Sequence, residues 1–131
     1  MKLTNNTKRA KGMTLLELTV VILVLLSLIS ILFIGARAWK KGSDKAGCIM
    51  NIRNVQQAVR SWQNMNAKNV SDAFVLTDDI IGSGLFVETD PVCPGAGTYG
   101  FVTQVPDVGT LVMTCSLATT EDHVPSSIAG W

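Results

Sequence analysis

Histidine is almost missing from this chain of 131 residues, since His123 is the only one. A metal cluster built from several histidines is therefore excluded, and a lone histidine near the C-terminus is expected to be solvated. No serine, cysteine or threonine has a recognisable base partner, so an enzyme is not expected. No EF-hand spacing occurs either, and no cofactor is expected. The acidic pairs Asp78–Asp79 and Glu121–Asp122 leave calcium open, but solvated caps and loops also explain them.

Neither sign of charge is in clear excess, because the formal net charge is only +1. This balance indicates no general attraction to nucleic acid. Arg53 and Arg60 share a helix face, but two arginines do not make a nucleic-acid patch. The first twelve residues nevertheless carry four basic side chains and no acid: Lys2, Lys8, Arg9 and Lys11. Without them, 7 basic residues face 10 acidic ones.

Proline is absent from Met13 to Asn66, and from Met13 to Ala36 nearly every residue is apolar or small. As a helix this run would be about 36 Å long, enough to cross a hydrocarbon core of about 30 Å. A secretory signal has an apolar region of only ~7–15 residues, so that interpretation fits poorly. A plain membrane anchor remains an alternative.

Glu17 is the one charged residue inside the apolar run. A carboxylate in lipid costs on the order of 2–3 kcal/mol when it is central, and less near an interface. It should therefore have a cation as partner, and the run itself supplies none.

The segment Lys11-Gly12-Met13-Thr14-Leu15-Leu16-Glu17-Leu18 resembles the processing motif of type IV pilins and type II secretion pseudopilins. The resemblance implies cleavage by a prepilin peptidase between Gly12 and Met13, followed by N-methylation of Met13. Phenylalanine is commoner at the first mature position, so Met13 is a mild departure. Glu17 becomes the fifth mature residue, where the family places its glutamate for filament assembly. Its carboxylate can pair with the new ammonium of Met13, which relieves both charges in lipid.

The same resemblance implies an α+β fold of the pilin "lollipop" type. We expect a leader at 1–12, a membrane and filament-core helix at 13–36, an amphipathic half of the same helix at 37–66, and a small head at 67–131. The expected partners are copies of the chain, other pilins or pseudopilins, the peptidase, the inner-membrane assembly platform and lipid. The chain would first be a single-pass protein of a bacterial inner membrane with its head outside the cytoplasm. It would then join a periplasmic or extracellular filament.

Helical periodicity continues after the apolar run. The expected apolar stripe consists of Ile49, Ile52, Val55, Val59, Trp62 and Met65, with Arg53, Gln56, Gln57, Arg60 and Gln63 on the other surface. The helix should end near 64–69. Gly35, Gly42 and Gly47 each cost roughly 1 kcal/mol in a helix interior. They indicate either close packing or a flexible section.

The head is predicted to contain a short helix and a β-hairpin. Thr77-Asp78-Asp79 is expected to cap a short helix that contains Ile80, Ile81, Leu85 and Phe86, with Gly82 and Gly84 limiting its length. Strands are predicted at 98–105 and 110–116, with a turn between them. Cys93 and Cys115 flank this hairpin, and we expect a disulfide between them to staple an exported head. Cys48 would be a small buried residue, although a bridge from Cys48 to either cysteine stays open.

Segments beyond the motif are also similar to pseudopilin-like proteins, namely 48–62, Cys93-Pro94 through Tyr99, and Thr114-Cys115-Ser116. The sequence therefore predicts a structural subunit of a type II secretion or type IV pilus-like filament. A DNA-uptake or adhesive pilus subunit is the alternative function. A basic filament surface for DNA conflicts with the acidic mature chain.

Overall fold

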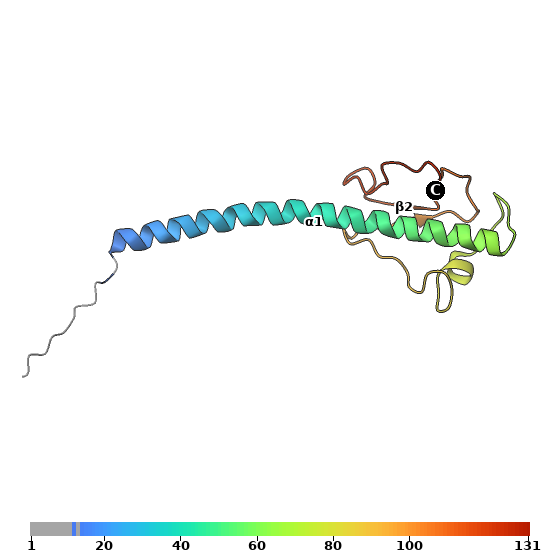
Figure 1. Ribbon diagram of the computed structural model, residues 1–131, viewed down its shortest axis with the longest axis horizontal. Coiled ribbons are helices and arrows are strands. Elements are labelled where there is room, and N and C mark those ends of the chain that lie inside the picture. The colour runs from blue at the N-terminus through green and yellow to red at the C-terminus, as the bar shows by residue number, and fades with distance from the viewer. Residues whose placement is uncertain (1–11, 13) are drawn as a thin grey trace, which may run out of the picture. The chain divides into compact units, whose positions relative to one another are not determined.

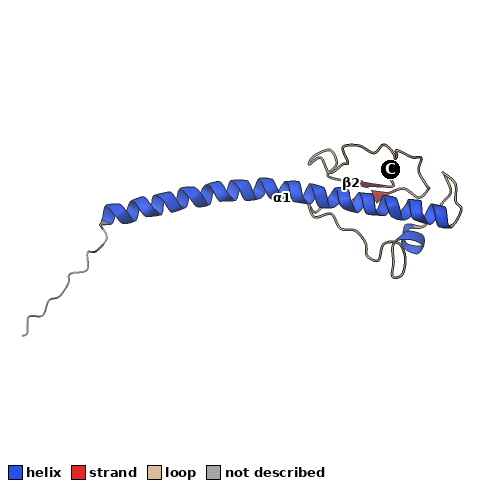
Figure 2. Cartoon of the chain, viewed as in Figure 1, coloured by secondary structure: helices blue, strands red, loops and turns tan. Residues whose placement is uncertain are grey.

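The computed structural model describes Gly12 and residues 14–131. Its elements are, in chain order, the helix α1 (Leu15–Met65), the π-helix η1 (Leu76–Ile80), and the strands β1 (Tyr99–Phe101) and β2 (Met113–Cys115) (Figures 1 and 2). One long helix with a small antiparallel sheet confirms the predicted α+β class. Residues 1–11 of the predicted leader and Met13 lie outside the described residues.

Helix α1 matches the helix predicted over 13–66 to within two residues. The absence of proline explains this length, because each backbone N–H after the first turn can donate within the helix. Gly35, Gly42 and Gly47 do not interrupt it. The chain divides into two compact units, Met1–Arg37 and Ala38–Trp131.

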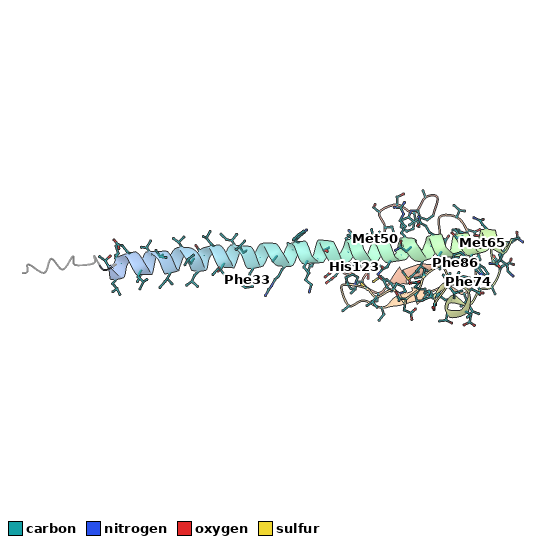
Figure 3. The ribbon with its side chains drawn as sticks, turned by 60° about the horizontal axis from the view of Figure 1, so that its bottom comes forward. Phe33, Met50, Met65, Phe74, Phe86 and His123 are labelled. Carbon is teal, nitrogen blue, oxygen red and sulfur yellow. The ribbon has the colours of Figure 1, made fainter. Side chains whose placement is uncertain are left out.

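The described part of the first unit is a helix with no covering layer. Its large apolar side chains from Leu15 to Ile34 are between 45% and 80% exposed, and Phe33 projects freely from the helix (Figure 3). By length and composition, α1 is apolar and long enough to cross a membrane. An apolar surface this continuous is expected to be covered by lipid or by another protein.

The core of the second unit lies between the C-terminal half of α1 and the segments that follow it. The helix contributes Cys48, Ile52, Val55, Ala58, Val59 and Trp62, and the later segments contribute Phe74, Ile80, Ile81, Cys93, Val105, Val112, Met113 and Cys115. The predicted stripe is therefore largely confirmed. Met65 is wrongly placed in it, because this side chain at the helix end is 77% exposed (Figure 3).

Gln56 is a second departure from the predicted helix faces, since it is buried rather than on the polar surface. Its Nε2 donates to the carbonyl oxygen of Thr110 at 3.0 Å, and its Oε1 accepts from the backbone N–H of Val112 at 2.8 Å. The Gln56 amide is thus the hydrogen-bond partner of the Thr110 carbonyl and of the Val112 N–H. These two bonds explain why a polar side chain lies in the core.

The predicted hairpin exists but is shorter than expected. β1 and β2 pair antiparallel with Tyr99 opposite Cys115 and Phe101 opposite Met113. Val102 N–H still donates to Val112 O at 3.0 Å, but from Thr103 on the chain pairs with the loop after α1 instead. Ser71 N–H donates to Val105 O at 2.8 Å, and Phe74 N–H donates to Thr103 O at 3.1 Å. These non-local partners end the hairpin pairing.

The predicted capping of the short helix is wrong. η1 begins at Leu76, so Asp78 and Asp79 lie inside it. It ends at Ile80, so the predicted continuation through Ile81, Leu85 and Phe86 is wrong as well. The N-cap residue is Val75 instead. Its backbone N–H donates to the Asp79 carboxylate at 2.7 Å. Ile81 then forms a bridge with Val87.

Candidate functional site

The predicted processing site lies at the start of α1. Gly12 is exposed and outside the helix. Because Met13 lies outside the described residues, its cleavage and methylation stay predictions. Just after Met13, Thr14 and Glu17 form a reciprocal pair of hydrogen bonds.

Thr14 and Glu17 form a capping box. The backbone N–H of Thr14 donates to Glu17 Oε2 at 3.3 Å, and the backbone N–H of Glu17 donates to Thr14 Oγ1 at 3.3 Å. The Thr14 carbonyl accepts the N–H of Leu18 at 3.2 Å. Two N–H groups that the first helical turn leaves unpaired are thereby satisfied. The sequence pattern Thr-x-x-Glu carries this signal, but only the charge of Glu17 was recognised from the sequence.

The capping box gives Glu17 a structural role that does not depend on its charge. Either a glutamate or a glutamine can complete a capping box. Among the residues that the structure describes, no cation pairs with the Glu17 carboxylate. The observed capping by Glu17 is therefore distinct from its predicted charge pairing, and the two can be tested separately.

A second group of reactive side chains lies buried in the second unit. Cys48, Cys93, Cys115 and His123 place their Sγ and ring nitrogen atoms within 4.8 Å of one another, and we call them the cysteine–histidine cluster. The expectation of a solvated His123 is wrong, because its exposed fraction is 1%. The long segment after β2 folds back and places the ring beside Cys93.

The predicted disulfide partners are neighbours in this cluster. Cys93 Sγ lies 3.8 Å from Cys115 Sγ and 3.5 Å from His123 Nδ1. All three cysteines are free thiols in the structure. Cys48 is fully buried, as expected of a small core residue, but it belongs to the same cluster. A bond between Cys93 and Cys115 stays a prediction.

The loop after Cys93 is shaped by two glycines. A side chain at Gly97 would place its Cβ 2.8 Å from Cys115 Sγ, and one at Gly95 would lie 2.8 Å from His123 Cε1. Both positions thus require glycine for close approach of the backbone. Burial raises the pKa of Cys93, but the N–H groups of Gly97 and Gly95 together with His123 outweigh it and lower this pKa to about 7.

Cys48 has the opposite electrostatic environment. Burial raises the pKa of this thiol to about 12, although the Tyr99 hydroxyl opposes the shift. That hydroxyl donates to Cys48 Sγ at 3.4 Å and accepts from Asn51 Nδ2 at 3.2 Å. Burial also raises the pKa of Tyr99.

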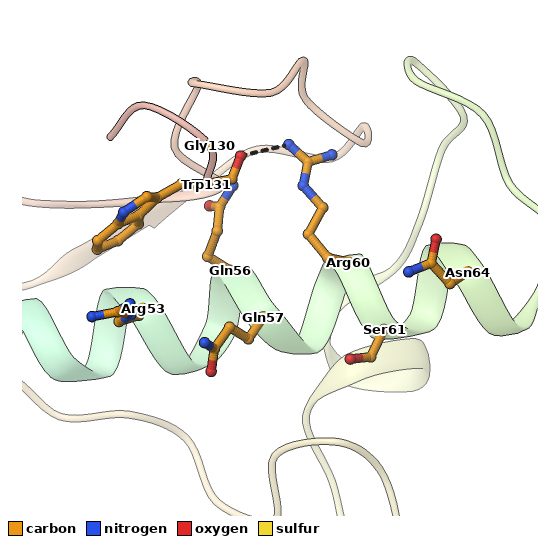
Figure 4. A pocket seen from close by; sticks show the side chains of 8 residues that line it. All are labelled: Arg53, Gln56, Gln57, Arg60, Ser61, Asn64, Gly130 and Trp131. Carbon is orange, nitrogen blue, oxygen red and sulfur yellow. Dashed lines mark hydrogen bonds between the residues drawn. The ribbon is translucent and has the colours of Figure 1, made fainter. Parts of the chain in front are cut away.

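A pocket of about 460 Å³ lies over the polar face of α1 (Figure 4). Arg60 donates to the carbonyl oxygens of Pro106 at 2.8 Å, Asp107 at 3.0 Å and Trp131 at 3.3 Å. The Arg53 guanidinium lies 5.5 Å from the Trp131 ring centroid. Both arginines are thus engaged in holding the C-terminal segments against the helix.

The two acidic pairs are engaged within the chain as well. The Asp79 carboxylate accepts the backbone N–H of Val75, as described above. Glu121 Oε2 lies 3.7 Å from His123 Nε2, and Asp122 pairs with Lys45. These contacts connect the loop around His123 with the helix.

Comparisons with known proteins add no relative, since no family model, curated protein or solved structure matches this chain. The function of the chain is therefore inferred from its own residues and from the resemblance of residues 11–18 to a processing motif.

Proposed function

We propose that this chain is a structural subunit of a pilin-like filament of the type II secretion or type IV pilus class, processed by a prepilin peptidase after Gly12. The observation that carries the proposal is the start of α1. A basic segment, an exposed glycine and a capped apolar helix follow one another there, and Glu17 is the helix's first acid.

The uncovered apolar helix supports this proposal. Before assembly, lipid would cover the side chains from Leu15 to Ile34, because a helix in lipid satisfies its own backbone groups. In a filament, the same helix from neighbouring copies would replace the lipid. The small second unit, with its own core, would remain outside the membrane.

Glu17 would then select the packing register. After cleavage, the ammonium of Met13 lies one residue before Thr14, whose N–H already binds Glu17 Oε2. The carboxylate would be held near the helix start, where the positive end of the helix dipole also favours it. A second carboxylate oxygen remains available for an ammonium of the same copy or of a neighbour.

The two roles of Glu17 can be tested separately. Glu17→Gln keeps the capping box but removes the charge, so we expect insertion and processing without filament assembly. Thr14→Ala removes the cap hydroxyl at a cost of ~1 kcal/mol and keeps the charge, so filaments should still form.

Assembly is measured in cells that hold a prepilin peptidase and a filament assembly platform, by comparing the sheared filament fraction with the membrane fraction. Glu17→Leu, which loses both roles, serves as the reference for complete failure. Normal filaments from Glu17→Gln would refute the need for the charge. If Thr14→Ala lost its filaments while Glu17→Gln kept them, assembly would depend on the helix cap formed by Thr14 and Glu17 rather than on the charge.

A further inference from the structure

The cysteine–histidine cluster joins four distant parts of the second unit. Cys48 lies on α1, Cys93 on the loop before β1, Cys115 on β2 and His123 on the segment after it. All four side chains are at most 5% exposed. Three sulfurs and one imidazole within 4.8 Å of one another are the donor set of a closed structural zinc site.

The distances agree with this chemistry. Tetrahedral zinc with Zn–S of about 2.3 Å and Zn–N of about 2.0–2.1 Å sets sulfurs about 3.8 Å apart and a sulfur and a nitrogen about 3.5 Å apart. The cluster has 3.8 Å between Cys93 Sγ and Cys115 Sγ, and 3.5 Å between Cys93 Sγ and His123 Nδ1. The other pairs of ligand atoms are at most 4.8 Å apart. Small side-chain rotations would shorten these distances to the tetrahedral values.

We propose that Cys48, Cys93, Cys115 and His123 bind one zinc ion as a Cys₃His site that fastens the second unit together. The three thiols release their protons to solvent and Zn²⁺ takes their place, so the step needs no oxidant or reductant. Thiolate and imidazole donors in a tetrahedral arrangement favour zinc over magnesium or calcium. This inference does not depend on the proposed filament function.

A disulfide accounts for the cluster less completely. Bonded sulfurs are about 2.0 Å apart, so Cys93 and Cys115 would have to approach from 3.8 Å. The bond would leave the buried Cys48 thiol and His123 ring without a role. Zinc uses all four groups, and it suits a small core that needs a staple.

Glu121 supplies the outer contact that such a histidine requires. With Nδ1 facing the metal, the N–H at Nε2 is left for another acceptor, and metal-bound histidines commonly donate this proton to a carboxylate. Glu121 Oε2 lies 3.7 Å from His123 Nε2. That ring nitrogen has no hydrogen-bond partner among the described residues. Glu121 is therefore a positioning residue, which a small rotation would bring into hydrogen-bond range.

The direct test uses the full chain, purified in detergent without chelator or reductant. Elemental analysis counts zinc per chain, and intact mass after denaturation and alkylation counts free thiols. We expect about one zinc ion and three alkylated cysteines. A chain without zinc and with one alkylated cysteine would contain a disulfide, which would overturn the proposal. A chain without zinc whose three thiols take up no added zinc would overturn it as well. Neither result bears on filament assembly.

Substitutions then assign the ligands. Cys48→Ser and His123→Gln should each lose zinc, whereas a disulfide between Cys93 and Cys115 would survive both changes. Cobalt uptake by the unmodified chain gives a spectrum that reports thiolate coordination without any substitution, in case a variant fails to fold. Zinc retained by both variants would show that the metal binds elsewhere, against the proposal.

The role of Glu121 has a matched control in its neighbour. Glu121→Gln should weaken zinc binding about tenfold in chelator competition. Asp122→Asn, which changes an exposed carboxylate paired with Lys45, should leave zinc affinity unchanged. Equal affinities for these two variants would remove Glu121 from the proposed site.

Discussion

Gln56→Leu is expected to destabilise the second unit while leaving α1 intact. The substitution keeps the side-chain volume but removes the acceptor for the Val112 N–H and the donor for the Thr110 carbonyl. Val112 is 1% exposed, so its N–H would have no access to water. The Thr110 carbonyl lies closer to solvent and loses less.

The size of the effect follows from these contacts. An unsatisfied buried N–H costs about 1–3 kcal/mol, and the lost bond to Thr110 adds about 0.5–1 kcal/mol. Burial of the apolar leucine recovers part of this, which leaves a net loss of about 2 kcal/mol. For a domain of this size, that loss lowers the melting temperature by roughly 8–16 °C.

The assay is thermal unfolding of the full chain in detergent, followed by tryptophan fluorescence. Gln57→Leu is the matched control, because Gln57 is the exposed neighbour on the same helix and should change stability by less than ~0.5 kcal/mol. Equal melting temperatures for the two variants would refute the role assigned to Gln56.

Two further predictions concern the packing of α1 in the second unit. Gly47→Ala should lower the melting temperature because its Cβ would lie 2.9 Å from Pro94 Cγ, whereas Gly42→Ala, with nothing within 4 Å, should stabilise the helix by up to ~1 kcal/mol. Equal effects of the two alanines would contradict close packing at Gly47. Arg60→Lys should increase amide exchange at Gly109 and Trp131, because lysine lacks the planar fork that binds three carbonyls. Unchanged exchange at both amides would remove Arg60 from this role.

The sequence predicted what depends on local periodicity. The long helix followed from the absence of proline and from apolar side chains at helical spacing, and both signals are local. The glycines are a partial exception. Periodicity could not decide between close packing and flexibility, whereas the contact of Gly47 with Pro94 favours packing at that position.

The errors concern contacts between distant segments. The strands were predicted too long because the pairing of 103–105 with the loop after α1 has no local signature. His123 was expected in solvent because nothing near it in sequence indicates that it returns to Cys93. Gln56 was placed on the polar face because periodicity cannot identify a buried amide that binds two backbone groups. The three cysteines, although recognised, could not be assigned to one cluster.

Substitution of Gly12 provides the reference for cleavage between Gly12 and Met13. A leucine at this position should block the peptidase, so Gly12→Leu should keep its leader and run as the longer precursor. A mature mass from this variant would contradict cleavage at Gly12.

The most direct measurement is the intact mass of the unmodified chain, extracted from membranes of a host that carries a prepilin peptidase. We expect a chain that begins at Met13 and carries one added methyl group at its N-terminus. A chain that still carries residues 1–12 and an unmodified start would contradict it.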